Sequence, residues 1–171
     1  MGITKQKLYY WEIKNSASLP RKTVNAVIEK AQKLFALSEG ECERLATAAG
    51  ISLTKSDMTL YEVLHTVYQG PLRRLCAAAS IDERALRNYK RKLPPKHILL
   101  PLCAALGLND AQTDDFLRKL GYCLSASIVT DCVAAFYLRK NSEQNGVKTL
   151  NAINETLFSM GLSTLGVKNA K

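Results

Sequence analysis

The segment DERALRNYKRK, residues 82–92, carries side chains whose types and spacing suit hydrogen bonding to an anionic polymer. Two acids begin it, and five bases and one asparagine follow. On a helix, Arg84, Arg87 and Asn88 share one side. Arginine can form two hydrogen bonds to guanine, and asparagine can form two to adenine. Flanking lysine and arginine residues can form ion pairs with phosphate. The segment therefore predicts a binding surface. A merely solvated charged face is the alternative, although such faces tend to alternate in sign.

The charge of the whole chain indicates the same class of partner. The 171-residue sequence has a net charge of +9, from 24 Lys and Arg against 15 Asp and Glu. Residues 71–96 contain two acids and eight bases, which are Arg73, Arg74, Arg84, Arg87, Lys90, Arg91, Lys92 and Lys96. Such a basic stretch attracts nucleic acid, but charge alone proves only attraction.

Helices are the elements that must position this segment. Apolar residues recur with a helical period in almost every segment, and convincing strand alternation is absent. We predict an all-α helical bundle with helices at residues 23–37, 38–50, 58–69, 72–80, 82–92, 96–107, 110–121, 127–140 and 146–161.

The helices at 72–80 and 82–92 are joined at AASID, a tight link with small residues. A helix-turn-helix requires this arrangement: its first helix braces across the DNA backbone, and its second lies in the major groove. Ile81 is expected to fill the core at the turn, and Leu86 and Tyr89 are expected to face inward.

The stretch LRRLCAAASIDERALRNYKRKLPPKHILLPLCAALGLNDAQTDDFLRKLGY has a turn ending in Ile and a basic loop with proline. An apolar helix ending in Leu-Gly-Leu and an acidic helix ending in Gly follow. In these features residues 58–124 resemble the DNA-binding domain of the Xre/Cro/lambda-repressor-like proteins. The resemblance implies a lambda-repressor-like helix-turn-helix domain in which helix 82–92 enters the major groove. The candidate DNA-binding residues are Glu83, Arg84, Arg87, Asn88, Arg91, Lys92, Arg73 and Lys96.

The chain departs from this family at the start of the predicted major-groove helix. Asp82 and Glu83 stand where the family often has Gln, Ser or Thr. Two acids there favour the helix dipole but repel phosphate, although a glutamate can accept a hydrogen bond from cytosine N4. The loop KRKLPPKH also lacks the glycine that is usual in the family.

Two segments of the chain match at an offset of 71 residues, which predicts a degenerate tandem repeat. LSEGECERLATAAGISL (37–53) aligns with LNDAQTDDFLRKLGYCL (108–124), and upstream ITKQKLYYWEIK (3–14) aligns with 81–92. Two similar helix pairs reached by chance are the alternative. Residues 1–53 then resemble a truncated helix-turn-helix unit, and 54–124 form the DNA-binding domain. Residues 125–171 close the core or form a dimer interface, with fraying expected from 163 onward.

The remaining sequence gives no sign of catalysis. The five cysteines (Cys42, Cys76, Cys103, Cys123 and Cys132) show no CxxC pair, which predicts buried reduced thiols. The two histidines have no second ligand at metal-binding spacing, and no catalytic motif occurs. We therefore predict no enzyme, no metal site and no cofactor. The chain has neither a secretory signal nor an 18-residue apolar run, which predicts a cytoplasmic protein without membrane association.

Taken together, the sequence predicts a repressor-like transcriptional regulator of a bacterium or mobile element that binds double-stranded DNA as a homodimer. One alternative is an adaptor or antitoxin-like module that keeps the fold, has lost base recognition and binds a protein partner. The other is a non-specific nucleic-acid binder.

Overall fold

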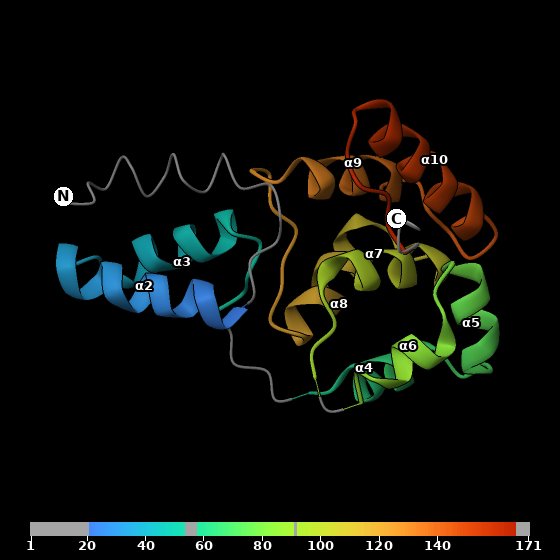
Figure 1. Ribbon diagram of the computed structural model, residues 1–171, viewed down its shortest axis with the longest axis horizontal. Coiled ribbons are helices and arrows are strands. Elements are labelled where there is room, and N and C mark those ends of the chain that lie inside the picture. Colours follow the sequence, from blue (N-terminus) through green and yellow to red (C-terminus); the bar gives the residue numbers. More distant parts are fainter. Residues whose placement is uncertain (1–20, 54–57, 91, 167–171) are drawn as a thin grey trace.

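The computed structural model describes residues 21–53, 58–90 and 92–166 (Figure 1). In these ranges the regular structure is helical apart from one isolated β-bridge, which confirms the predicted all-α class. The helices are α2 (Arg21–Phe35), α3 (Glu39–Ala48), α4 (Leu60–Val67), α5 (Leu72–Ala78), α6 (Glu83–Arg87), α7 (Lys96–Ala105), α8 (Asp110–Lys119), α9 (Val129–Leu138) and α10 (Gly146–Ser159). Within the described ranges, no helix has the length and apolar character needed to cross a membrane.

Polar side chains fix the residues at which α3, α4 and α8 begin. In each case the residue before the helix accepts a hydrogen bond from the backbone of the third helical residue, whose side chain accepts one in return. The pairs are Ser38 with Glu41, Thr59 with Glu62 and Asn109 with Gln112. Each capping box satisfies two N–H groups that have no partner inside the helix.

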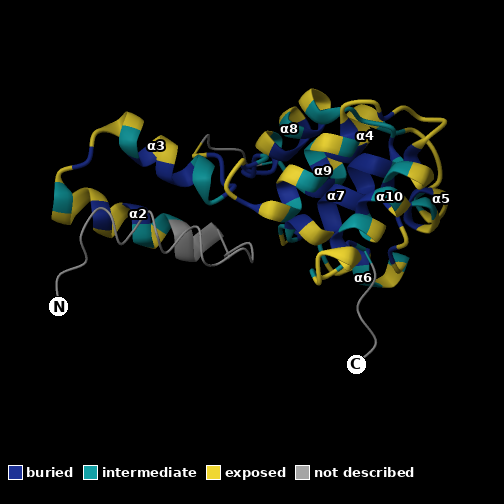
Figure 2. Ribbon diagram, turned by 90° about the horizontal axis from the view of Figure 1, so that it is seen from above, coloured by how far each residue is buried: buried dark blue, intermediate teal, exposed yellow. Residues whose placement is uncertain are grey.

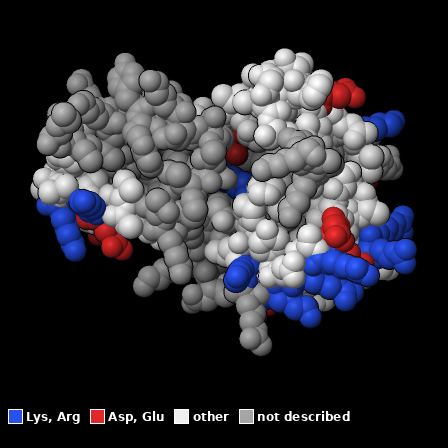
Figure 3. All heavy atoms as spheres, viewed as in Figure 1, with Lys and Arg blue, Asp and Glu red and all other residues white. Residues whose placement is uncertain are grey.

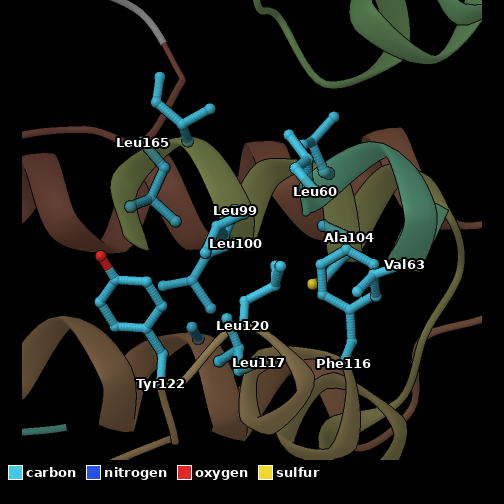
Figure 4. Close-up of a cluster of buried hydrophobic side chains, with 14 of the residues drawn as sticks. Leu60, Val63, Leu99, Leu100, Ala104, Phe116, Leu117, Leu120, Tyr122 and Leu165 are labelled. Atoms are coloured by element: carbon cyan, nitrogen blue, oxygen red, sulfur yellow. The ribbon is translucent and has the colours of Figure 1, made fainter. Parts of the chain in front are cut away.

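The largest part of the core surrounds α7 (Figure 2). Every residue from 98 to 104 is buried, and Leu99 and Leu102 are completely so. The helix packs against α5, α8 and α10. Figure 4 shows Leu60 of α4 and Phe116 of α8 in the same cluster of side chains. A helix that is apolar on all sides must be covered on all sides, and this makes α7 the central helix.

Residues 21–53, which we call unit A, meet residues 96–124, which we call unit B, just after α3 and α8. The backbone contacts are an antiparallel bridge between Ile51 and Tyr122 and hydrogen bonds from Ser52 N–H to the Gly121 carbonyl (3.2 Å) and from Cys123 N–H to the Gly50 carbonyl (3.1 Å). Applying the predicted offset of 71 residues converts each of these hydrogen bonds into the other. The two units are therefore related at this contact by a local two-fold axis.

The helix ends in the two units also match at this offset. Gly50 and Gly121 both adopt the left-handed conformation, with φ of 70° and 74°. The N–H group of the next residue returns to a carbonyl near the end of its helix, at 2.9 Å in both units. Ala36 after α2 and Gly107 after α7 are likewise equivalent, with φ of 47° and 73°. A common origin of the units stays a prediction, and the upstream segment 3–14 of the predicted repeat lies outside the described residues.

The end of the described chain is held against α7. Pro101 has no N–H group, so the His97 carbonyl lacks its usual donor within the helix. Gly166 N–H donates to this carbonyl at 3.1 Å. Leu165 is buried, and the Asn154 side chain binds both its N–H (2.7 Å) and its carbonyl (3.2 Å). The prediction of fraying from residue 163 is therefore wrong for Leu165 and Gly166.

Candidate nucleic-acid interface

The helix pair predicted as a helix-turn-helix consists of α5, the link 79–82 and α6. The two helices pack against each other. Ser80 in the link has a φ of 53°, and the Ile81 N–H then returns to a carbonyl of α5. Leu86 is completely buried and Ile81 nearly so, as predicted for both residues. Ala79 is also completely buried. This buried contact behind the link fixes the orientation of α6 on α5.

The second helix is shorter than predicted. Its cap is Asp82, whose carboxylate accepts from the Arg84 N–H at 2.9 Å, and α6 ends at Arg87 rather than at residue 92. Beyond α6, the N–H groups of Asn88, Tyr89 and Lys90 each donate a hydrogen bond to the carbonyl three residues earlier in the chain. Tight turns thus follow α6 directly, and Pro94 is buried just before α7. The prediction missed this because the side-chain pattern continues past the point where the backbone leaves the helix.

Basic side chains gather where α5 and α6 lie (Figure 3). The cationic surface consists of six exposed residues, Arg73, Arg74, Arg84, Arg87, Lys90 and Lys92. The exposed Asn88 directly follows α6. Five predicted contact residues are therefore exposed here: Arg73, Arg84, Arg87, Asn88 and Lys92. Arg74 and Lys90 join them although the prediction omitted them, and the density of bases in residues 71–96 was the signal for both. Arg91 lies outside the described residues.

Lys96 is not part of the cationic surface, and its prediction as a DNA contact is wrong. Its side chain is only 4% exposed, and its ammonium forms an ion pair with the Asp131 carboxylate of α9. Asp131 also accepts from the Ser125 N–H at 3.0 Å. Burial raises the pKa of the Asp131 carboxyl, and the adjacent ammonium opposes this rise. A lysine enclosed in this way cannot reach phosphate.

Glu83 lies against Arg87 on α6. Its Oε1 atom accepts a hydrogen bond from Arg87 Nη2 at 2.5 Å, and the two residues are one helical turn apart. The Glu83 side chain is 25% exposed and that of Arg87 is 62% exposed. The hydrogen bond and the negative charge of Glu83 raise the pKa of Arg87. Glu83, which was predicted as a DNA contact, thus forms an ion pair with Arg87 in the free protein.

Four of the five cysteines are buried free thiols, as predicted, and only Cys132 is exposed. Burial raises the pKa of Cys76, Cys103 and Cys123, so these thiols stay protonated and poorly nucleophilic. Among the described residues, no three or more His, Cys, Asp or Glu side chains are grouped to hold a metal ion.

No family model, no curated protein and no solved structure matches this chain.

Proposed function

We propose that this protein binds double-stranded DNA in a sequence-specific manner, with α6 in the major groove, and thereby regulates transcription. The observation that carries the proposal is the cationic surface, which lies on and beside the second helix of a tightly linked pair. Arg84, Arg87 and Asn88 supply hydrogen-bond donors for the edges of nucleobases. The other basic residues of the cationic surface suit contacts with phosphate. The resemblance noted above supports a repressor-like regulator of a bacterium or mobile element.

The dimensions of α6 are compatible with the groove. A helix with its side chains is about 10–12 Å in diameter, and the major groove of B-DNA is about 12 Å wide. With five residues, α6 extends about 7.5 Å along its axis. Helix-turn-helix proteins contact bases with the first residues of their second helix. Glu83 and Arg84 hold those positions, and Arg87 and Asn88 follow one turn later. A short helix is therefore sufficient for the contacts that the proposal requires.

Exposed apolar groups on and just after the last two helices support a dimer. Phe136 of α9 is 66% exposed, and Phe158 and Met160 at the end of α10 are 76% and 53% exposed. Exposed apolar groups that form a contiguous patch mark interaction surfaces, and α9 and α10 pack against each other. Groove-binding domains usually act as two-fold pairs, so these helices are where the proposal places a second copy.

The test is selection from random DNA duplexes with the purified protein, followed by sequencing. We expect enrichment of one short motif, as an inverted repeat if the dimer forms, with affinity that falls steeply as salt rises. Arg87→Ala and Asn88→Ala should each cost about 1–3 kcal/mol of binding free energy at one or two base positions. Lys92→Ala should weaken binding to all duplexes alike and lower the salt slope by about one.

Arg44→Ala is the matched control, because it removes one positive charge from an exposed position of α3, outside the cationic surface. It should leave the selected motif and its affinity close to wild type. If Arg87→Ala weakens binding to every duplex equally, the protein is a non-specific nucleic-acid binder. If the wild type binds no duplex at low salt, an adaptor or antitoxin-like role replaces the proposal. The exposed aromatic groups of α9 and α10 would then be the place to search for its protein partner.

A further inference from the structure

The ion pair on α6 has a geometry that bears on base selection. Glu83 and Arg87 stand one turn apart, with the acid nearer the N-terminus, which is the favourable order for such a pair. The Glu83 side chain is the more covered of the two, and the Arg87 side chain is the more exposed. The less exposed Glu83 therefore holds a guanidinium whose side chain remains largely accessible to a ligand.

The hydrogen bond leaves most of the guanidinium free. A guanidinium has five N–H donors in a fixed planar fork, and the bond to Glu83 Oε1 is made by Nη2. The remaining donors are sufficient for the two hydrogen bonds that an arginine makes to guanine O6 and N7. Such a pair of bonds requires one orientation of the plane, whereas attraction to phosphate does not.

We propose that Glu83 is a positioning residue, which holds the Arg87 guanidinium in the orientation that selects a guanine at one position of the DNA site. This inference rests on the proposed function and adds to it a division of labour between two arginines. Arg84, also exposed on α6, has no ion-pair partner among the described residues. The Arg87 guanidinium is accordingly oriented before DNA binds, whereas that of Arg84 must be oriented by the DNA itself.

The charge of Glu83 argues against a role in affinity alone. A carboxylate on the surface that faces DNA repels phosphate, so it weakens the electrostatic attraction that supplies non-specific binding. A role in stability alone is also a weak explanation, because exposed ion pairs one helical turn apart contribute little to folding. If Glu83 fixes the orientation of Arg87, the gain in selectivity compensates for the repulsion between the carboxylate and phosphate.

The experiment compares Glu83→Gln with Asp115→Asn as a matched control. Asp115 forms the same kind of ion pair with Lys119 one turn later on α8, away from the cationic surface, at 2.8 Å. Selectivity is measured as the Kd for the duplex in which the critical guanine is replaced, divided by the Kd for the selected duplex. We expect Glu83→Gln to lower this ratio about tenfold, while binding to unrelated duplex DNA stays equal or becomes tighter. Asp115→Asn should change neither quantity.

Arg87→Lys shows whether Glu83 acts through Arg87, because lysine keeps the charge but loses the planar fork. In an Arg87→Lys background, Glu83→Gln should have no further effect on selectivity. The inference is overturned if Glu83→Gln keeps wild-type selectivity, or if it lowers selectivity equally in both backgrounds, as a direct contact from Glu83 to a base would. A wild type that selects no motif would instead refute the proposed function itself.

Discussion

Units A and B each contain a pair of helices that correspond at the offset of 71 residues, and the two pairs have different surroundings. Ile28 and Ala31 of α2 are buried, as are Leu99 and Leu102, which occupy the equivalent positions of α7. Leu34 of α2, in contrast, is 62% exposed. The register of the helices, their caps and their left-handed ends correspond in the two units. Their burial differs.

The difference between the two units follows from the composition of their first helices. The sequence of α2, RKTVNAVIEKAQKLF, places apolar residues on one side of the helix and charged residues on the other. This helix packs against α3. The sequence of α7, KHILLPLCAA, has no charged residue after Lys96, and α7 packs against α5, α8 and α10. An amphipathic helix needs one covered face, and a helix that is apolar all round needs neighbours on all sides. Unit B is therefore the core on which the cationic surface is built.

The largest effect should come from the buried ion pair between Lys96 of unit B and Asp131 of α9. Asp131→Ala leaves the Lys96 ammonium enclosed without its counter-ion. We expect the free energy of unfolding to fall by about 3–5 kcal/mol. Urea denaturation at pH 7, followed by circular dichroism, measures this loss.

The equivalent position in unit A provides the contrast, because Asn25 stands where unit B has Lys96. The Asn25 Oδ1 atom is buried without a hydrogen-bond partner among the described residues, so Asn25→Ala should change stability by less than about 1 kcal/mol. The double variant Lys96→Met/Asp131→Leu, which removes both charges, should recover most of the loss. An Asp131→Ala protein that unfolds at the wild-type urea concentration would show that the ammonium is not enclosed.

The next largest effect should have opposite signs in the two units. A methyl group on Gly107 would collide with the backbone of Ser142 and Glu143, and the φ of 73° disfavours any side chain. Gly107→Ala should cost roughly 2–4 kcal/mol. Ala36, at the equivalent position, is exposed and already has a φ of 47°. Ala36→Gly should relieve this strain and stabilise by up to about 1 kcal/mol. Thermal unfolding measures the change in stability of both variants relative to the wild type. Destabilisation by both substitutions would show that the two helix ends are not equivalent.

Features that depend on neighbouring residues could be predicted from the sequence. The helical class follows from apolar periodicity, and Ser38 with Glu41 marks a helix start at a spacing that has a direct physical cause. Gly50 and Gly121 mark helix ends for an equally local reason, since glycine tolerates a positive φ. The exposure of Arg84 and Arg87 followed from the burial of Leu86 on the other side of the same helix.

Features that depend on distant residues could not be predicted in this way. Lys96 resembles a surface base in the sequence, and only Asp131, which lies 35 positions later, accounts for its burial. The buried Leu165 depends on Asn154 and on the carbonyl that Pro101 leaves free, which no local pattern indicates. Likewise α6 ends at Arg87, seven residues before the buried Pro94, and no local pattern in the sequence marks either fact.

The smallest effect tests whether the two units unfold together. Ser38→Ala and Asn109→Ala remove the equivalent capping boxes of α3 and α8, and each should cost about 1 kcal/mol of helix stability. Because α8 belongs to the larger core, Asn109→Ala should lower the global free energy of unfolding by about that amount. Because unit A has fewer buried contacts, we expect α3 to open before the global transition. Ser38→Ala should then lower the global value by much less.

Native-state hydrogen exchange separates the two cases at the level of single amides. In Ser38→Ala the amides of α3 should exchange about fivefold faster, as expected for a loss of about 1 kcal/mol, while those of α7 stay unchanged. In Asn109→Ala the amides of α7 and α8 should both exchange faster. Equal acceleration of α3 and α7 in Ser38→Ala would mean that the contact at Ile51 and Tyr122 couples the two units into one cooperative structure. The difference in burial between the units would then have no thermodynamic consequence.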